Sequence, residues 1–367
     1  MTKRQAMKRI LIAAVLMLLA GTAYTKDDVK YTDAAGFPVY GKAVDDTFDR
    51  YGRLPGYLQG KVRGPVWNLG RNSAGLFIRF RSNSTSVSVK WTSLSEVYMN
   101  HMSPVGIRGL DLYILHDGEW RFAGAGRPQG KSTETVMVSG MEQADREYML
   151  YLSLYDGIED IEIGVDSDAY IEQPAVASPS ARKPVVMYGT SILQGGCVSR
   201  PGMAFTNMIA RELDRVVVNL GFSGNALLDY EIAELMAQVE DPGVFVLDYV
   251  PNASARQIAE RGETFFRILR DAHPDVPVIF IEDPQFPHTL FNKRIAEEVG
   301  RKNREQKALY DRLKRQGFRK LYYITSENLI GDDGEATVDA IHFTDLGASR
   351  YVSKVLPVIR KALRKCR

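Results

Sequence analysis

The sequence predicts an α/β protein in two parts: an all-β sandwich of the jelly-roll kind, followed by a three-layer α/β/α domain. Between residues 64 and 166, apolar and polar residues alternate with a period of two, which is typical of half-buried strands. From residue 184 onward, short Val-rich runs alternate with helical stretches, which predicts parallel strands buried on both faces. The length of 367 residues also favours two cores over one.

The N-terminus has the composition of a secretory signal peptide. An uncharged run over residues 10–23 follows four basic residues, Lys3, Arg4, Lys8 and Arg9. We expect a signal peptide over residues 1–23, cleaved after Ala23, because the run is shorter than the roughly 20 residues that span a membrane. An uncleaved anchor is the alternative, and Thr22 stands where a lipid-bearing cysteine would be required. The expected location is therefore periplasmic or secreted, with no integral membrane segment after cleavage.

Charge and cysteine content narrow the classes of partner. The formal net charge is +2 for the whole chain, and loss of the four basic residues of the signal peptide turns it into −2. Such a balance offers no electrostatic attraction to nucleic acid or acidic membranes. Only two cysteines occur, Cys197 and Cys366, so no disulfide framework is predicted. These two residues could pair or remain separate thiols, and the oligomeric state is left open.

The first domain is expected over residues 24–175. Alternation over residues 76–81 and 86–91 predicts two strands, and residues 148–152 and 161–165 continue the series. Asp117-Gly118 separates two apolar runs and predicts a β-hairpin. Residues 170–183, with several Pro, Ala and Ser residues, are predicted to form the linker.

The second domain is expected over residues 184–367. The predicted strands cover residues 185–188, 216–218, 244–247, 276–281 and 321–324. The predicted helices cover residues 203–213, 228–239, 255–269, 294–313 and 346–363. The helix at residues 294–313 is rich in charge, so we interpret it as a solvated face without a function.

Polar motifs follow the predicted parallel strands. They are Gly189-Thr190-Ser191, Gly221-Phe222-Ser223-Gly224, Pro251-Asn252 and, near the end of the chain, Asp339-Ala340-Ile341-His342. Ligands bind beyond the carboxyl ends of the strands in an open parallel sheet, so these motifs should converge on one crevice.

Together these residue types supply what acyl transfer requires. A serine needs a neighbouring base, and the base needs a third group to orient it, roles that Ser191, His342 and Asp339 can fill. The developing oxyanion needs hydrogen-bond donors, which the amides of Ser191 and Gly224 and the side chain of Asn252 can supply. Each motif alone is also common in ordinary turns. Their order, spacing and strand-end placement together favour catalysis, without a metal or a cofactor.

The motifs resemble those of the SGNH (GDSL-type) hydrolases, whose name-giving Ser, Gly, Asn and His match Ser191, Gly224, Asn252 and His342 in turn. Asp339 precedes His342 by three residues, as in the last motif of that family. Residues 109–113, Gly-Leu-Asp-Leu-Tyr, resemble the GxDLY motif of a domain found before certain SGNH hydrolases. The sequence departs from the family pattern at Thr190 and Ala253, where many members have Asp. Neither position carries a chemical role here, so these departures concern the subfamily.

The resemblance implies an esterase, and the predicted export favours a small-molecule or glycan ester as substrate. Exported SGNH enzymes with a β-domain resemble bacterial carbohydrate esterases, so we expect release of short acyl groups, acetyl first, through an acyl-Ser191 intermediate.

The residues after the fourth parallel strand, 282–288, could line the pocket and make His288 a candidate substrate-binding residue; a surface loop is the alternative. A lipase, thioesterase or lysophospholipase with the same triad, or an inert glycan-binding module, are the competing functions. Acyl-chain preference and glycan binding by the β-domain are left open.

Overall fold

The computed structural model describes residues 29–365, and its first half is built from antiparallel strands. The ten strands of this β-rich region are β1 (Val29–Asp33), β2 (Val39–Tyr40), β3 (Phe77–Ser82), β4 (Val87–Ser93), β5 (Leu110–His116), β6 (Glu119–Gly126), β7 (Ser132–Val138), β8 (Arg146–Tyr151), β9 (Ile158–Asp166) and β10 (Ile171–Glu172). One sheet has the order β1-β9-β4-β7, and the other has the order β10-β3-β8-β5-β6, with β2 paired to β3. Two short helices, α2 (Gly64–Gly70) and α3 (Pro104–Arg108), interrupt the series.

The two sheets pack face to face as the sequence predicts. Their shared core holds the inward residues of the alternating runs, among them Ile78, Phe80, Val89 and Trp91. The Asp117-Gly118 turn joins β5 and β6, and both residues have the positive φ angles that this hairpin turn requires, 51° and 79°.

The prediction of half-buried strands is wrong for β3 and β8. Phe77 and Arg79 point away from the sandwich core, yet both are buried, as is Tyr151 on β8. The second half of the chain covers this face: the Tyr151 hydroxyl donates to the carbonyl of Asn207, and the Arg211 guanidinium lies 4.4 Å from the Tyr113 ring centre. Aromatic residues on this face therefore serve an interface rather than a solvated surface.

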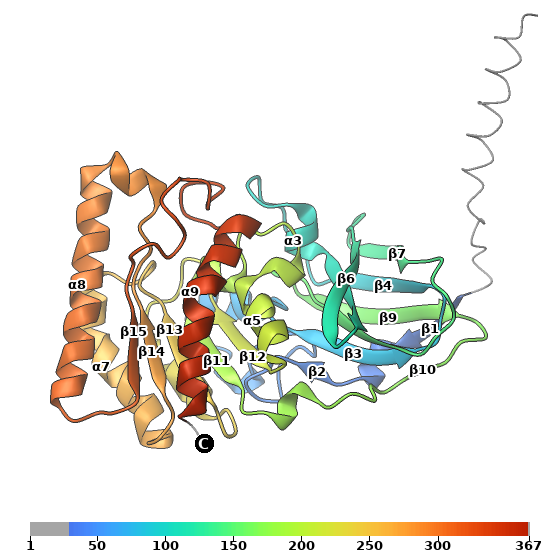
Figure 1. Cartoon of the computed structure of the whole chain (residues 1–367), viewed down its shortest axis with the longest axis horizontal. Helices are drawn as coiled ribbons and strands as arrows, with labels where there is room; N and C mark the ends of the chain where they lie inside the picture. The colour runs from blue at the N-terminus through green and yellow to red at the C-terminus, as the bar shows by residue number, and fades with distance from the viewer. Residues whose placement is uncertain (1–28, 366–367) are drawn as a thin grey trace, which may run out of the picture.

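The second half is a five-stranded parallel sheet between two layers of helices, as predicted (Figure 1). The sheet order is β12 (Val217–Gly221), β11 (Val185–Gly189), β13 (Val244–Asp248), β14 (Val278–Ile281) and β15 (Leu321–Ile324). Helices α5 (Phe205–Leu213) and α9 (Asp345–Arg364) pack on one face. The other face is covered by α6 (Tyr230–Ala237), α7 (Ala255–Ala272) and α8 (Lys293–Arg315). Short 3₁₀ helices occur at Ala34–Gly36, Gly56–Leu58, Pro179–Ala181, Pro201–Met203 and Pro287–Leu290.

Segments of the β-rich half enter both cores of the α/β half. Ala74, Met102 and Leu154 join the core beneath α5 and α9, whereas Leu54 and Val66 join the core beneath α6 and α7. The division at residues 175 and 184 remains a prediction, because these cores contain residues from both sides of it.

Buried Arg53 ties the same two halves together through backbone groups. Its guanidinium donates to the carbonyls of Asn219 and Gly221 at the end of β12, at 3.0 and 2.8 Å. Burial lowers the pKa of Arg53 to about 9. The close approach continues at Gly75, where a Cβ atom would lie 2.5 Å from the Cβ of Asn219. Only glycine fits there, so this position is dictated by packing between the halves.

The predicted signal peptide, residues 1–23, and Cys366 lie outside the described residues. Within residues 29–365, none of the helices has the length and apolar character to cross a membrane.

Candidate active site

Ser191 occupies the first turn of a short helix, α4 (Ser191–Gln194), directly after β11. Thr190 caps this helix, because its hydroxyl accepts a hydrogen bond from the backbone N–H of Ile192. An Asp at this position could cap the helix in the same way, which explains why Thr190 is tolerated there. A Cβ atom at Gly189 would lie 2.7 Å from the carbonyl oxygen of Asp248. Glycine therefore allows the end of β11 to lie this close to β13, directly before the helix that carries Ser191.

His342 and Asp339 reach Ser191 from the loop before α9. The Nδ1–H of His342 donates to Oδ2 of Asp339 at 2.7 Å, and Nε2 of His342 lies 2.8 Å from Oγ of Ser191. Because the carboxylate holds the proton on Nδ1, Nε2 is left to accept the serine proton. The sequence-predicted triad is therefore brought together in hydrogen-bonding order.

The loop around His342 is held by its own backbone. Val338 donates its N–H to the carbonyl of His342 at 2.8 Å, and the N–H of His342 donates to Oδ1 of Asp339 at 2.8 Å. Ala340 adopts a φ of 70°, which closes this tight turn. Phe343 is buried and packs its ring against Tyr351 of α9, at a centroid distance of 5.2 Å. These contacts fix where the imidazole stands relative to the sheet.

The environment of Asp339 keeps it ionised. Partial burial alone would raise the pKa of Asp339, but hydrogen bonds from the His342 ring and from the N–H groups of His342 and Ile341 lower it below its ordinary value. A carboxylate that stays charged can hold the Nδ1 proton and stabilise an imidazolium when one forms.

Gly224 and Asn252 line the same cavity as Ser191 and His342. Gly224 has a φ of 67°, in the left-handed region that favours glycine. The side-chain oxygen of Asn252 accepts from the N–H of Ala226 at 3.2 Å, so the amide Nδ2 is left as a donor. This arrangement places the predicted oxyanion-hole residues beside the serine.

Buried polar residues that sequence reasoning missed support the serine. Gln194 is fully buried; its amide N–H donates to the carbonyl of Leu154, and its oxygen accepts from the N–H of Ser223. The hydroxyl of Tyr155 donates to the carbonyl of Ser191 at 3.1 Å. Leu154 and Tyr155 belong to the β-rich half, so that half contributes directly to the position of α4. Lone Gln and Tyr residues carry no spacing signal, so no pattern could have revealed them.

The GxDLY motif binds the segment that follows the serine helix. Asp111 on β5 is fully buried and accepts hydrogen bonds from the Arg200 guanidinium and the Gly202 N–H, both at 2.7 Å. Arg200 also donates to the hydroxyl of Tyr113 at 2.7 Å. The motif thereby holds the segment that follows the serine helix.

The cavity beside Ser191, at the ends of the parallel strands, has a volume of about 640 Å³. Its far wall is helix α8, which contributes both apolar and charged side chains: Arg294, Ile295, Glu298, Val299, Arg301 and Lys302. The first turns of this helix, which its charge predicts to be a solvated face, therefore also line the cavity. The charges alternate with apolar residues around α8, and only the packing decides which of them face the cavity.

Asp283 and Lys302 also line this cavity. Their side chains form an ion pair of 2.6 Å, with the Asp283 side chain only 1% exposed. Burial raises the pKa of Asp283 despite the neighbouring ammonium group. The ion pair thus gives the cavity a buried polar part.

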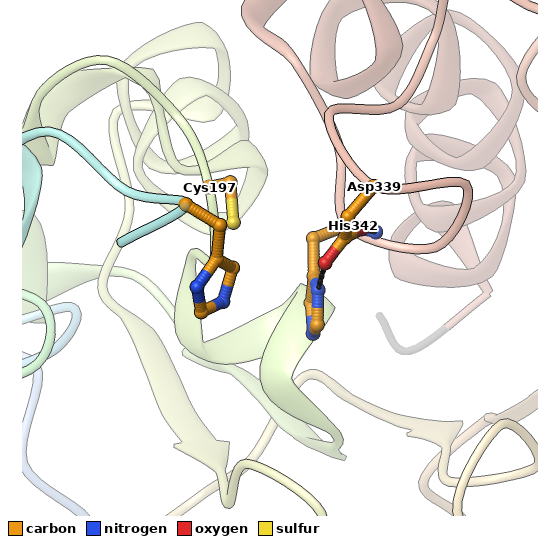
Figure 2. Close-up of side chains that lie close together, drawn as sticks. Cys197, Asp339 and His342 are labelled. Carbon is orange, nitrogen blue, oxygen red and sulfur yellow. Dashed lines mark hydrogen bonds and ion pairs between the residues drawn. The ribbon is translucent and has the colours of Figure 1, made fainter. Parts of the chain in front are cut away.

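Three further residues surround the triad. His288 lines the cavity, and its Nδ1–H donates to the carbonyl of Ala340 at 2.7 Å, so the loop at residues 282–288 lies at the site. His101, on the loop between β4 and α3, has its ring centre 5.6 Å from that of His342. Cys197 is buried on the loop after α4 and faces the Asp339–His342 pair (Figure 2). Sequence reasoning named His288 but missed His101, which is distant in the chain.

The comparisons with known proteins agree with this geometry. Residues 182–360 match the GDSL-like lipase/acylhydrolase family, and residues 29–171 match the GxDLY family, described as the N-terminus of Esterase_SGNH_hydro-type proteins. A GDSL-like lipase from Bacteroides ovatus is 37% identical over 92% of this chain and 98% of its own, with a TM-score of 0.88. No curated protein sequence matches the chain.

Two further solved structures share the fold at low identity. A salicylyl-acyltransferase from a tetracycline biosynthetic pathway is 14% identical over 93% of this chain and 98% of its own, with a TM-score of 0.73. A family two carbohydrate esterase from Cellvibrio japonicus is 12% identical over 92% of this chain and 99% of its own, with a TM-score of 0.59.

The fold and the family matches together define a carboxylic ester hydrolase with an N-terminal β-domain. The chain belongs to the GDSL-like lipase/acylhydrolase family, within the SGNH hydrolases, as its motifs predict.

Proposed function

We propose that the protein is an exported serine esterase that removes short acyl groups, acetyl first, from carbohydrates. The observation that carries the proposed chemistry is the chain of hydrogen bonds from Asp339 through His342 to Ser191, at 2.7 and 2.8 Å. It lies against a cavity that also contains Gly224 and Asn252. An inert glycan-binding module would have no need of this alignment.

The proposed reaction has two displacements. Oγ of Ser191 attacks the ester carbonyl while Nε2 of His342 takes the hydroxyl proton, and the oxyanion accepts hydrogen bonds from Ser191, Gly224 and Asn252. The His342 proton passes to the leaving alcohol as the ester bond breaks. Water then attacks acyl-Ser191 with His342 again as base, and releases the carboxylic acid and free Ser191.

Substitution of Ser191 tests this chemistry. Ser191→Ala should lower kcat by about 10³-fold or more, because the oxyanion donors alone retain only a small part of the acceleration. Hydrolysis of p-nitrophenyl acetate and the mass of the acetylated enzyme after rapid quenching are the measurements. Ser199→Ala, which removes a nearby serine that bonds to Asp345, is the matched control. An acetyl group on another residue, or unchanged turnover in Ser191→Ala, would contradict the proposal.

Two features support a saccharide as the alcohol portion. Helix α8 presents Arg294, Glu298 and Arg301 to the cavity, and such side chains can bind hydroxyl groups. The fold is also shared with carbohydrate esterases, which supports the proposal only as an analogy.

A second candidate substrate class is supported by the apolar part of the cavity. Ile192, Phe286, Ile295, Val299 and Ile341 line it together with Ser191. A volume of about 640 Å³ exceeds what an acetyl group occupies, so an aromatic or medium-length acyl group could also bind. This observation favours the lipase or thioesterase alternative.

An acyl-length series separates the two candidates. The carbohydrate proposal predicts that kcat/KM for p-nitrophenyl esters falls from acetyl to octanoyl, and that acetate is released from acetylated xylan, pectin or sialic acid. Val299→Trp should narrow the apolar part and reduce turnover of long chains more than that of acetyl. Faster cleavage of octanoyl than of acetyl esters would favour the lipase or thioesterase function instead.

The proposed export has a separate test. Expression of the full chain with its own N-terminus should yield a periplasmic or secreted protein whose first residue is Tyr24, as determined by N-terminal sequencing. Recovery of the intact N-terminus in the membrane fraction would indicate the uncleaved anchor.

A further inference from the structure

Four metal-ligand side chains gather beside the serine, and the proposed reaction uses only two of them. They are His101, Cys197, Asp339 and His342, and one ligand atom from each lies within 4.8 Å of the others. Figure 2 shows the Cys197 sulfur and the Asp339–His342 pair facing each other. The four residues come from three separate segments: the β4–α3 loop, the loop after α4 and the loop before α9.

The chemistry of this set suits one class of cation. Two imidazoles and a thiolate are the borderline and soft ligands that Zn²⁺ and Co²⁺ prefer, and a carboxylate can complete their shell, whereas Mg²⁺ and Ca²⁺ prefer oxygen ligands alone. With the thiol deprotonated, the thiolate and the carboxylate carry two negative charges, which balance a divalent cation.

We propose that His101, Cys197, Asp339 and His342 form an inhibitory binding site for a divalent transition-metal cation, with Zn²⁺ as the expected ligand. The site is distinct from a catalytic metal centre, because the proposed ester hydrolysis needs no cation. Its function is to remove the catalytic base reversibly from the reaction.

The spacing requires only small side-chain movements. Zinc bonds of about 2.0 Å to nitrogen and about 2.3 Å to sulfur place tetrahedral ligand atoms roughly 3.3–3.8 Å apart. The four atoms therefore need to close in by about 1 Å, which rotation of His101 and Cys197 can provide. His101 is half-exposed on an irregular loop, so its ring has room to turn.

Binding exchanges a proton for the cation. The S–H bond of Cys197 breaks, its proton leaves to solvent, and the sulfur electron pair forms the bond to zinc. The exchange is reversible, because a proton returns to the sulfur when the cation leaves.

Occupancy would stop the proposed reaction at its first step. Once His342 and Asp339 bind zinc, the hydrogen bond between them is lost and the imidazole no longer accepts the Ser191 proton. This consequence rests on the proposed function, whereas the metal binding itself does not. Binding and activity are therefore measured separately.

Binding is measured with Co²⁺ on the full-length protein carrying Cys366→Ser, so that Cys197 is the only thiol. A thiolate-to-cobalt charge-transfer band should appear on titration, together with the visible bands of tetrahedral Co²⁺, and Zn²⁺ should displace both. Cys197→Ala should abolish the charge-transfer band. A titration without this band would overturn the inference.

Inhibition is measured on p-nitrophenyl acetate hydrolysis with Zn²⁺, with Mg²⁺ as the cation control. Cys197→Ala and His101→Asn should leave the rate without zinc within about twofold. Each should raise the zinc concentration for half-inhibition by about 10- to 100-fold or more, since even loss of a supporting partner costs that much. His116→Asn, which removes an exposed histidine on the β5–β6 hairpin, is the matched control and should change nothing.

The possible outcomes are distinguishable. If Cys197→Ala and His101→Asn are both half-inhibited at the same zinc concentration as the native enzyme, the proposed site is overturned, even if zinc inhibits the enzyme elsewhere. A cobalt charge-transfer band that depends on Cys197 but leaves hydrolysis unaffected would support the metal site and contradict the proposed role of His342.

Discussion

At the scale of single residues, the site depends on how tightly one short loop orients His342. Asp339 accepts three hydrogen bonds, two from backbone N–H groups and one from the imidazole. The backbone bonds hold the carboxylate in place independently of the histidine. A neutral amide at this position could keep much of the loop geometry, but it would no longer hold the ring proton of His342 on Nδ1.

Asp339→Asn should therefore lower kcat by about 10⁴-fold with little change in KM, because the imidazole loses the acceptor that holds its tautomer. Since the pKa of Asp339 is lowered, its carboxylate is ionised at all pH values above its ordinary range. Protonation of Asp339 should consequently not be the cause of any loss of activity in the native enzyme above that range. Steady-state kinetics across pH are the measurement.

Asp332→Asn, an exposed carboxylate on the same segment, is the control and should retain normal turnover. Near-native kcat in Asp339→Asn would show that another group orients His342.

At the scale of elements, α7 packs against α8, the helix that brings charged side chains to the cavity. The helices approach closely at Gly262, where a Cβ atom would lie 2.5 Å from a methyl group of Leu309. The next residue, Glu263, accepts a hydrogen bond from Arg267 on its own helix at 2.8 Å and another from Arg312 on α8 at 2.9 Å. These hydrogen bonds lower the pKa of Glu263 to about 2. One carboxylate thus joins the two helices.

Glu263→Gln should lower the free energy of unfolding by about 1 kcal/mol near pH 7, an estimate that allows for partial solvent screening. A folded-state pKa of about 2 lies below the ordinary value of 4.5, so the contribution is complete above about pH 5 and is lost as the pH falls toward 2. Urea unfolding should therefore show a smaller difference in the free energy of unfolding between the native protein and Glu263→Gln at about pH 3 than at about pH 7.

Glu260→Gln, which breaks an exposed ion pair with Arg256 within α7, provides the comparison. It should change stability by less than about 0.5 kcal/mol. If Glu263→Gln lowers the free energy of unfolding by the same amount at both pH values, the carboxylate charge does not join the helices.

At the scale of the whole molecule, the β-rich and α/β halves share buried polar contacts as well as cores. Asp111 is fully buried opposite Arg200, and burial raises the pKa of Asp111 even with the guanidinium present. Removal of the partner would leave an uncompensated charge in an apolar interface. Since Arg200 follows the serine helix, the same change would loosen the site.

Arg200→Ala should lower the free energy of unfolding by about 3 kcal/mol near neutral pH, with a reduced kcat. The unpaired Asp111 has a raised folded-state pKa, so its cost grows as the pH rises above its ordinary value of 3.8 and shrinks in acid. Urea unfolding followed by tryptophan fluorescence and by circular dichroism should give one coincident transition.

Addition of Asp111→Asn should restore part of the stability lost in Arg200→Ala, because the double variant buries no charge. Arg121→Ala, which removes an exposed partner of Glu119, should have little effect. Two separate transitions in the native protein would contradict the shared interface.

The sequence by itself determined the fold class, the order of the parallel strands along the chain and the catalytic motifs. These features are local: a Val-rich run predicts β11, Asp117-Gly118 predicts the hairpin, and Ser191 stands within three residues of its own strand end. Such signals need only the period of side chains along a strand or helix and the rule that parallel strands end at one edge.

Only the tertiary structure decided which distant residues meet at that edge. His101 and Cys197 lie 96 positions apart and face the last loop of the chain, while Gln194 finds its acceptor at Leu154, 40 positions away. Helix α8 could have presented either of its charged faces to solvent, and contact with α7 selected the one at the cavity. No local period encodes these contacts, because they result from how complete layers pack against each other.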